Sequence, residues 1–197
     1  MHRLLLALPA ILLVGCAAES PETDTTVVVD PDTLAVAVPA GATSAVAELT
    51  PTDSTADAPS GRVEFIEVAG GVEIRYNLAG LPGAGPFGFH VHETGDCGPD
   101  STGTPAGAAG GHFNPMASPH GAHDAAPTAR HAGDLGNVTP GADGRAVGTL
   151  TDSLLAFTGP TTLVGRAVVL HAEADDLETQ PTGDAGGRIA CGVIEAR

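Results

Sequence analysis

Histidines are concentrated in four short motifs, and this feature most restricts the folds open to the chain. The motifs are GFHVHE at 88–93, GGHFNP at 110–115, HGAHDAAPTARHAGDLGN at 120–137 and VVLHAEADD at 168–176. Neutral imidazole is the commonest metal-binding side chain, so this density within about eighty residues is hard to explain by packing alone. The chain is therefore expected to bring motifs that are distant in sequence together around two metal ions.

The first motif places His90 and His92 two residues apart. On a continuous strand, side chains two apart point to the same face, which suits chelation of one ion. The last motif ends an apolar run at His171 and continues into Asp175 and Asp176. A single histidine pair is weak evidence, but these residues accompany a second cluster.

The second cluster combines three imidazoles and a carboxylate on one long loop: His112, His120, His131 and Asp134. Such a set can close a four-coordinate site, as structural zinc sites do. His123 could compete with His120 as a ligand, but the spacing from His112 favours His120. We interpret His123 as a solvated loop residue.

Composition and patterning favour a β-rich domain. The 197 residues fit one domain with appendages, and 27 Gly, 16 Pro and 3% aromatic residues suit a small-residue β-core with many turns. No long stretch has a helical period, whereas short segments predict strands at 63–68, 72–78, 86–91, 146–151, 163–170 and 189–194, with a weaker one at 45–49. This pattern predicts an all-β, antiparallel sandwich or barrel, with a long loop and no strand from Gly95 to about Pro140.

The charge is strongly acidic. The net charge is -16, from 24 acidic and 8 basic residues, and every basic residue is Arg. Nucleic acid is therefore an unsuitable partner. A Lys-free acidic surface suits a high-salt habitat, where salt screens self-repulsion, although a GC-rich genome explains the loss of Lys equally well.

The N-terminus has the features of a targeting segment. Arg3 precedes an apolar run that ends at Cys16, and the run is shorter than the ~20 apolar residues of a spanning helix. The segment resembles a bacterial lipoprotein signal, cut before a lipidated Cys16; an ordinary secretory signal with a chance cysteine is the alternative. We expect a signal peptide at 1–15, Cys16 and an acidic, Thr- and Pro-rich tether at 16–41, and a folded domain at 42–197. Short apolar pieces at 27–29 and 34–38 leave an additional edge strand open.

Cysteine usage agrees with export. Lipidation of Cys16 would leave Cys97 and Cys191, which can pair in an oxidising compartment. Two buried thiols are the alternative. The expected location is the bacterial cell envelope, with the domain in the periplasm or on the outer surface and a lipid anchor in the membrane.

The motifs and their order resemble the copper/zinc superoxide dismutase family, in its bacterial, lipoprotein-type form, over the whole domain from about residue 42. The resemblance implies a Greek-key, immunoglobulin-like sandwich with long metal-binding loops. It implies a copper site formed by His90, His92, His112 and His171. It also implies a zinc site formed by His112, His120, His131 and Asp134, with His112 bridging the two ions.

The resemblance assigns roles beyond the ligands. Asp175 would bond one ligand of each metal, Arg188 would draw the anionic substrate to copper, and Cys97 and Cys191 would form the disulfide. The implied reaction converts superoxide to dioxygen and hydrogen peroxide, with His112 and Arg188 as catalytic residues. A membrane-tethered copper carrier without turnover is the alternative function. The chain is also a candidate to form a homodimer.

This chain also departs from the family. The segment between Cys97 and His112 is lengthened, and the loop between Leu177 and Thr182 is short and carries no Lys. Arg188 is then expected to be the main positive side chain near copper in a strongly negative protein.

Overall fold

The computed structural model describes residues 43–53, 58–83 and 85–197. The signal peptide, the lipidation site Cys16 and the tether predicted for residues 1–41 lie outside these ranges. Within them the elements are β1 (Ser44–Pro51), β2 (Ser60–Val68), β3 (Gly71–Ala79), β4 (Phe87–His92), the short 3-10 helix η1 (Gly107–Ala109), β5 (Asp134–Val138), β6 (Ala146–Asp152), β7 (Ala167–His171), β8 (Arg188–Val193) and β9 (Glu195–Ala196). No helix in this part of the chain is long and apolar enough to cross a membrane.

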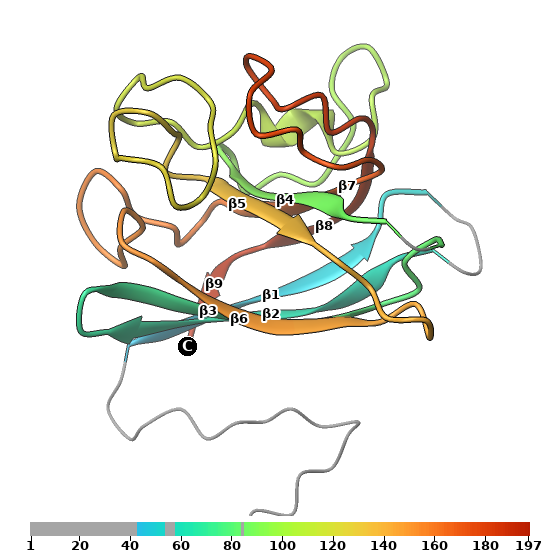
Figure 1. Cartoon of the computed structure of the whole chain (residues 1–197), viewed down its shortest axis with the longest axis horizontal. Helices are drawn as coiled ribbons and strands as arrows, with labels where there is room; N and C mark the ends of the chain where they lie inside the picture. The colour runs from blue at the N-terminus through green and yellow to red at the C-terminus, as the bar shows by residue number, and fades with distance from the viewer. Residues whose placement is uncertain (1–42, 54–57, 84) are drawn as a thin grey trace, which may run out of the picture. The chain divides into compact units, whose positions relative to one another are not determined.

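The strands form one antiparallel, nearly closed barrel. Their order is β5-β4-β7-β8-β1-β2-β3-β6, and β9 pairs with β1 outside this path. Figure 1 shows two layers, with β1, β2, β3 and β6 in one and β5, β4, β7 and β8 in the other. Strand β1 belongs to both layers, because it pairs with β2 along most of its length and with β8 at Thr50 and Pro51. The all-β antiparallel prediction is confirmed.

Strand β4 directs its two histidines to the outer face of the barrel. Its six residues are all buried, although a strand in a one-sided sheet normally alternates. Phe87, Phe89 and Val91 point into the main hydrophobic core, so His90 and His92 point to the opposite face. That outer face is buried because loops cover it.

Two loops cover the outer face of the β5-β4-β7-β8 layer. One joins β4 to β5 and the other joins β7 to β8, and both lie on the same side of the barrel in Figure 1. A second, smaller apolar cluster underlies them, formed by Ala106, Ala109, Ala167, Val169 and Cys191, with Cys97 packed against it. The disulfide Cys97–Cys191, with a sequence separation of 94, ties the first loop to β8. The predicted pairing of these cysteines is therefore confirmed.

One strand was not predicted, and one predicted strand begins at the wrong residue. The stretch from Gly95 to Pro140 was expected to contain no strand, but β5 lies within it at Asp134–Val138. Its pairing with β4 includes a register irregularity between Gly88 and His90, where Gly136 adopts a φ of 82°. A glycine bulge of this kind breaks the alternating pattern by which strands are recognised in a sequence.

The strand expected at 163–170 begins later, at Ala167. Gly165 has a φ of 80°, which a β-branched residue would not tolerate and which turns the chain just before the strand. In the turn that precedes the strand, Leu163 lies within the core and Val164 packs against it.

Candidate metal centre

The first ligand cluster lies on the outer face of the β4-β7 pair. His90 and His92 come from β4 and His171 ends β7, and the antiparallel register pairs His90 with Val169. His112 joins them from the covering loop through an isolated β-bridge to His92. One ligand nitrogen from each of the four lies within 4.8 Å of the others, and all four side chains are buried. The residues predicted to bind copper are thus brought together.

The second cluster surrounds one oxygen atom of Asp134. Its Oδ1 lies 2.8 Å from Nδ1 of His112, 3.0 Å from Nδ1 of His120 and 3.1 Å from Nδ1 of His131. Donors placed ~2.0 Å from a tetrahedral zinc ion are ~3.3 Å apart, so these separations are close to those of a zinc site. The predicted zinc ligands are also brought together, and His112 belongs to both clusters.

The donor atoms fit two metal ions better than a hydrogen-bonded core. Nδ1 of His90 and Nε2 of His112 are buried without a hydrogen-bond partner. An unsatisfied buried polar group costs about 1 to 3 kcal/mol, and a bound ion would remove that cost for both atoms. Imidazole nitrogens suit both copper and zinc, and the added carboxylate suits zinc.

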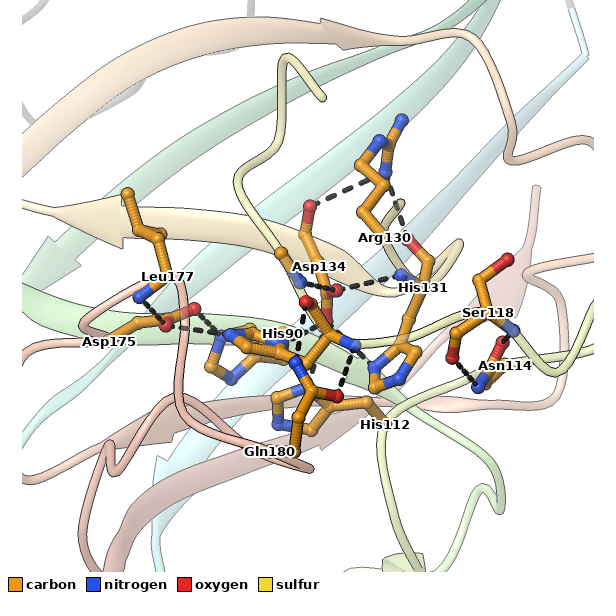
Figure 2. Close-up of polar contacts among 12 residues, drawn as sticks. His90, His112, Asn114, Ser118, Arg130, His131, Asp134, Asp175, Leu177 and Gln180 are labelled. Atoms are coloured by element: carbon orange, nitrogen blue, oxygen red, sulfur yellow. Dashed lines mark hydrogen bonds and ion pairs between the residues drawn. The ribbon is translucent and has the colours of Figure 1, made fainter. Parts of the chain in front are cut away.

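Asp175 connects the two clusters. Its Oδ2 lies 2.8 Å from Nε2 of His90, and its Oδ1 lies 2.9 Å from Nε2 of His120. Figure 2 shows Asp175 beside His90. When Nε2 of each ring donates to this carboxylate, Nδ1 keeps its lone pair for a metal ion. Asp175 therefore contacts one ligand in each cluster, which is the pair of contacts that the resemblance implies.

Burial keeps the copper-side imidazoles neutral. Loss of hydration, together with the charge of neighbouring histidines, lowers the pKa of His112 to about 4 and that of His171 to about 3. Burial also holds the pKa of His92 well below its usual value. A neutral imidazole is the form that binds metal, so these three rings are prepared for it at neutral pH.

The zinc side is held by negative charge. Burial disfavours a charged Asp134, but hydrogen bonds from His112, His120 and His131 hold the pKa of its carboxyl below its usual value. His120 contacts both Asp134 and Asp175, and their hydrogen bonds outweigh burial and raise its pKa to about 9. In the metal-free protein a proton therefore occupies part of the position that a zinc ion would take.

Arg188 lies at the start of β8, beside the copper cluster. It is half-buried, and its two terminal nitrogens donate to the carbonyl oxygens of Ala106 (2.5 Å) and Gly110 (2.6 Å). The Gly110 carbonyl also lies 3.0 Å from Nδ1 of His92. Arg188 is also the strand-register partner of His171, and its positive charge contributes to the lowered pKa of both His92 and His171.

His123 is outside both ligand clusters, as predicted, but it is not simply solvated. Its side chain is 27% exposed and Nε2 lies 3.4 Å from Asp152, a buried carboxylate paired with Arg130 at 2.7 Å. Arg130 also donates to the main-chain carbonyl of His131, next to the zinc cluster. The interpretation of His123 as a solvated residue is corrected in this respect.

The sequence reasoning missed two amide side chains that fix the loops. Asn137 of β5 accepts a hydrogen bond from the main-chain N–H of Asp175 (2.8 Å) and donates to its carbonyl (2.9 Å). Gln180 makes the same pair of contacts with the main chain of His120. Asn137 stands in the quoted GDLGN motif, but no pattern in the sequence marks Gln180.

Comparison with known proteins agrees with this geometry. Residues 59–194 match the family model described as copper/zinc superoxide dismutase. The chain belongs to the copper/zinc superoxide dismutase family. The superoxide dismutase [Cu-Zn] of Deinococcus radiodurans is 44% identical over 135 residues, which cover 64% of this chain and 71% of that protein. The crystal structure of the clock protein EA4 has a TM-score of 0.67 and 40% identity, and covers 77% of this chain and 93% of its own.

The superoxide dismutase carries a complete set of ligands for both ions. His90, His92, His112 and His171 form the copper site, and His112, His120, His131 and Asp134 form the zinc site. It is a copper- and zinc-dependent oxidoreductase that converts superoxide to dioxygen and hydrogen peroxide.

Proposed function

We propose that this dismutase is attached to the membrane of the cell envelope by a lipid anchor. Within its active site, His112 is the proton carrier and Arg188 is the residue that binds the substrate anion. The observation that carries the catalytic part is the position of His112. Its Nδ1 lies in the zinc cluster, 2.8 Å from Asp134, while its Nε2 is buried, has no hydrogen-bond partner and belongs to the copper cluster.

The reaction consumes protons, and Nε2 of His112 is placed to carry one of them. Two superoxide anions and two protons give one dioxygen and one hydrogen peroxide. When bound, copper supplies the one-electron exchange, which zinc cannot. Nε2 of His112 would take up one proton when the first superoxide has been oxidised and deliver it as the second is reduced, and the other proton would come from solvent. Asp134 and the zinc cluster hold the ring in place through Nδ1, so the proton moves at one defined atom.

Arg188 is suited to bind the incoming anion. Its guanidinium is always charged, and its two hydrogen bonds to main-chain carbonyls fix its plane beside His92 and His171. A guanidinium held in this way can form charge-assisted hydrogen bonds to a small anion. The loop 172–187 contains no basic residue, so this role falls to Arg188.

Export and lipid anchoring are supported by the chain's cysteines. The apolar N-terminal run ends at Cys16, and the Cys97–Cys191 disulfide is of a kind that persists in oxidising compartments. The reaction then takes place where superoxide would otherwise damage the envelope. A homodimer stays a prediction.

Lipidation can be measured directly. The full-length chain and its Cys16→Ser variant are expressed in a bacterial host fed with radiolabelled palmitate, and membranes are separated from soluble fractions. The proposal expects label and membrane retention in the parent chain and neither in the variant. A parent chain that is exported without label would show an ordinary secretory signal instead.

A further inference from the structure

Gln180 is an exposed residue of the loop 172–187, yet its side chain makes two hydrogen bonds with a buried metal ligand. Oε1 accepts from the main-chain N–H of His120 at 2.8 Å, and Nε2 donates to the main-chain carbonyl of His120 at 2.9 Å. Figure 2 shows Gln180 beside the ligand cluster. One side chain therefore satisfies both main-chain polar groups of a zinc ligand that is 60 positions away in sequence.

The same loop also holds the imidazole of His120. Asp175 lies 2.9 Å from its Nε2, and the main chain of Asp175 is fixed in turn by Asn137 of β5. Gly183 has a φ of 65° and passes so close to this contact that a Cβ there would overlap the Asp175 carboxylate. His120 is thus held at its main chain by Gln180 and at its ring by Asp175.

A ligand held at two points has its metal-binding atom fixed as well. With Nε2 against Asp175 and the main chain against Gln180, Nδ1 of His120 points to the position 3.0 Å from Asp134 where the other zinc ligands converge. Loss of the main-chain contacts would leave the ring free to turn about Asp175. Residues that orient ligands in this way affect metal affinity although they never touch the ion.

We propose that Gln180 is a positioning residue of the zinc site, which raises zinc affinity by fixing the main chain of His120 and couples zinc binding to the order of the loop 172–187. The coupling is reciprocal, because a contact that favours zinc binding must itself be favoured by zinc. The inference deepens the proposed function and rests on His120 as a zinc ligand.

The test compares Gln180→Met with the parent protein. Met has a similar length and no strong hydrogen-bonding group, so both contacts with His120 are lost while the bulk remains. Thr182→Ala is the matched control, since it shortens another side chain of the same loop that takes no part in these contacts. Metal-free full-length proteins are titrated with Zn²⁺ against a chromophoric chelator, and copper affinity is measured separately after zinc saturation.

The proposal expects zinc affinity about tenfold lower in Gln180→Met and unchanged in Thr182→Ala. It also expects faster hydrogen exchange at the His120 amide of the zinc-loaded variant, with the thermal midpoint of the metal-free protein and the copper affinity unchanged. Zinc affinity equal to the parent's would overturn it. So would an equal loss of copper affinity and metal-free stability, which would show a general structural role. Failure of the parent protein itself to bind zinc would instead overturn the assignment of the zinc site.

Discussion

At the scale of single residues, the site is organised by what each histidine does with its second nitrogen. His90 and His120 direct Nε2 to Asp175, and His92 directs Nδ1 to the carbonyl of Gly110. His112 differs, because both of its nitrogens face ligand clusters. A neutral imidazole with one nitrogen engaged has a defined tautomer, so each ring presents a known atom to its metal.

Replacing Arg188 should reduce turnover without removing the metals. In Arg188→Ala the substrate anion loses its fixed positive partner, so we expect the second-order rate with superoxide to fall by roughly tenfold or more. Arg188→Lys keeps the charge but loses the paired contacts with Ala106 and Gly110, so its rate should be intermediate. Superoxide decay by stopped flow, with copper and zinc contents measured on the same samples, checks this. A full rate in Arg188→Ala would refute the assigned role.

At the scale of elements, the strands supply three histidines together with Asp134 and Arg188, and the loops supply the other three ligands, His112, His120 and His131. Strands β4 and β7 place His90, His92 and His171 by their alternation. Loops of irregular structure are stable here because covalent and polar contacts replace a sheet ladder. These include the disulfide and the paired hydrogen bonds of Asn114 with Ser118, of Asn137 with Asp175 and of Gln180 with His120.

The division between strands and loops explains what the sequence predicts. Period-two alternation is local, so it predicts β2, β3 and β6 to within a few residues. The histidine spacing indicates the zinc set and the His90–His92 pair, whereas the full copper set follows from the resemblance to the family. Strand β5 was missed because Asp134 and Gly136 interrupt its apolar pattern. Gln180 could not be predicted, because its side chain contacts the main chain of His120, which is distant in sequence. A contact with main-chain atoms does not depend on the type of the partner residue, so it produces no recognisable sequence pattern.

Removing the disulfide should destabilise the loop that contacts Arg188. The disulfide between Cys97 and Cys191 closes a long loop, and this closure contributes on the order of 4 kcal/mol to the free energy of unfolding in the chain-entropy model. We expect the double variant Cys97→Ser, Cys191→Ser to lose about that much free energy of unfolding. Urea denaturation measures it. The carbonyls of Ala106 and Gly110 lie on the released loop, so dismutation should fall as well; a variant with the parent's stability would contradict the account.

At the scale of the whole molecule, the acidic charge sets how an anion approaches. The net charge is -16, and exposed acidic residues follow β7 in the loop beside the copper cluster: Glu173, Asp176, Glu178 and Asp184. The attraction of Arg188 acts at short range, while the field of the whole chain acts at a distance and is screened within about 10 Å at 0.1 M salt. The two contributions oppose each other.

Salt should therefore slow this enzyme little, or accelerate it. Rising ionic strength screens the long-range repulsion of superoxide more than the close contact with Arg188. The second-order rate measured from low to molar salt should be flat or rise. A steep fall would show that attraction governs the approach despite the net charge.

The metal-free protein should lose stability as pH falls below neutral. The folded pKa values of His112 and His171 are about 4 and about 3, below the ordinary 6.5, so the unfolded chain binds protons first. Their contribution is fully present above pH 6.5 and is lost as the pH falls toward these values. His120, with a pKa of about 9, has the opposite sign, but its contribution is lost only as pH rises from 6.5 through 9.

Urea denaturation of the metal-free protein at pH 7 and pH 5 tests this, with a lower unfolding free energy expected at pH 5. His171→Gln serves as the comparison, because it removes one of the titrating rings and should reduce the dependence on pH. Equal stability at the two pH values would show that these rings are not held neutral by burial.

The central claim is that one imidazole joins a redox site to a zinc site in a working dismutase. The most direct measurement is superoxide decay by the purified, disulfide-intact protein loaded with copper and zinc, beside a His112→Ala variant whose metal content is known. We predict fast, copper-dependent turnover that the substitution abolishes or lowers by orders of magnitude. Tight copper binding without turnover in the parent protein would contradict the claim and identify a copper carrier instead.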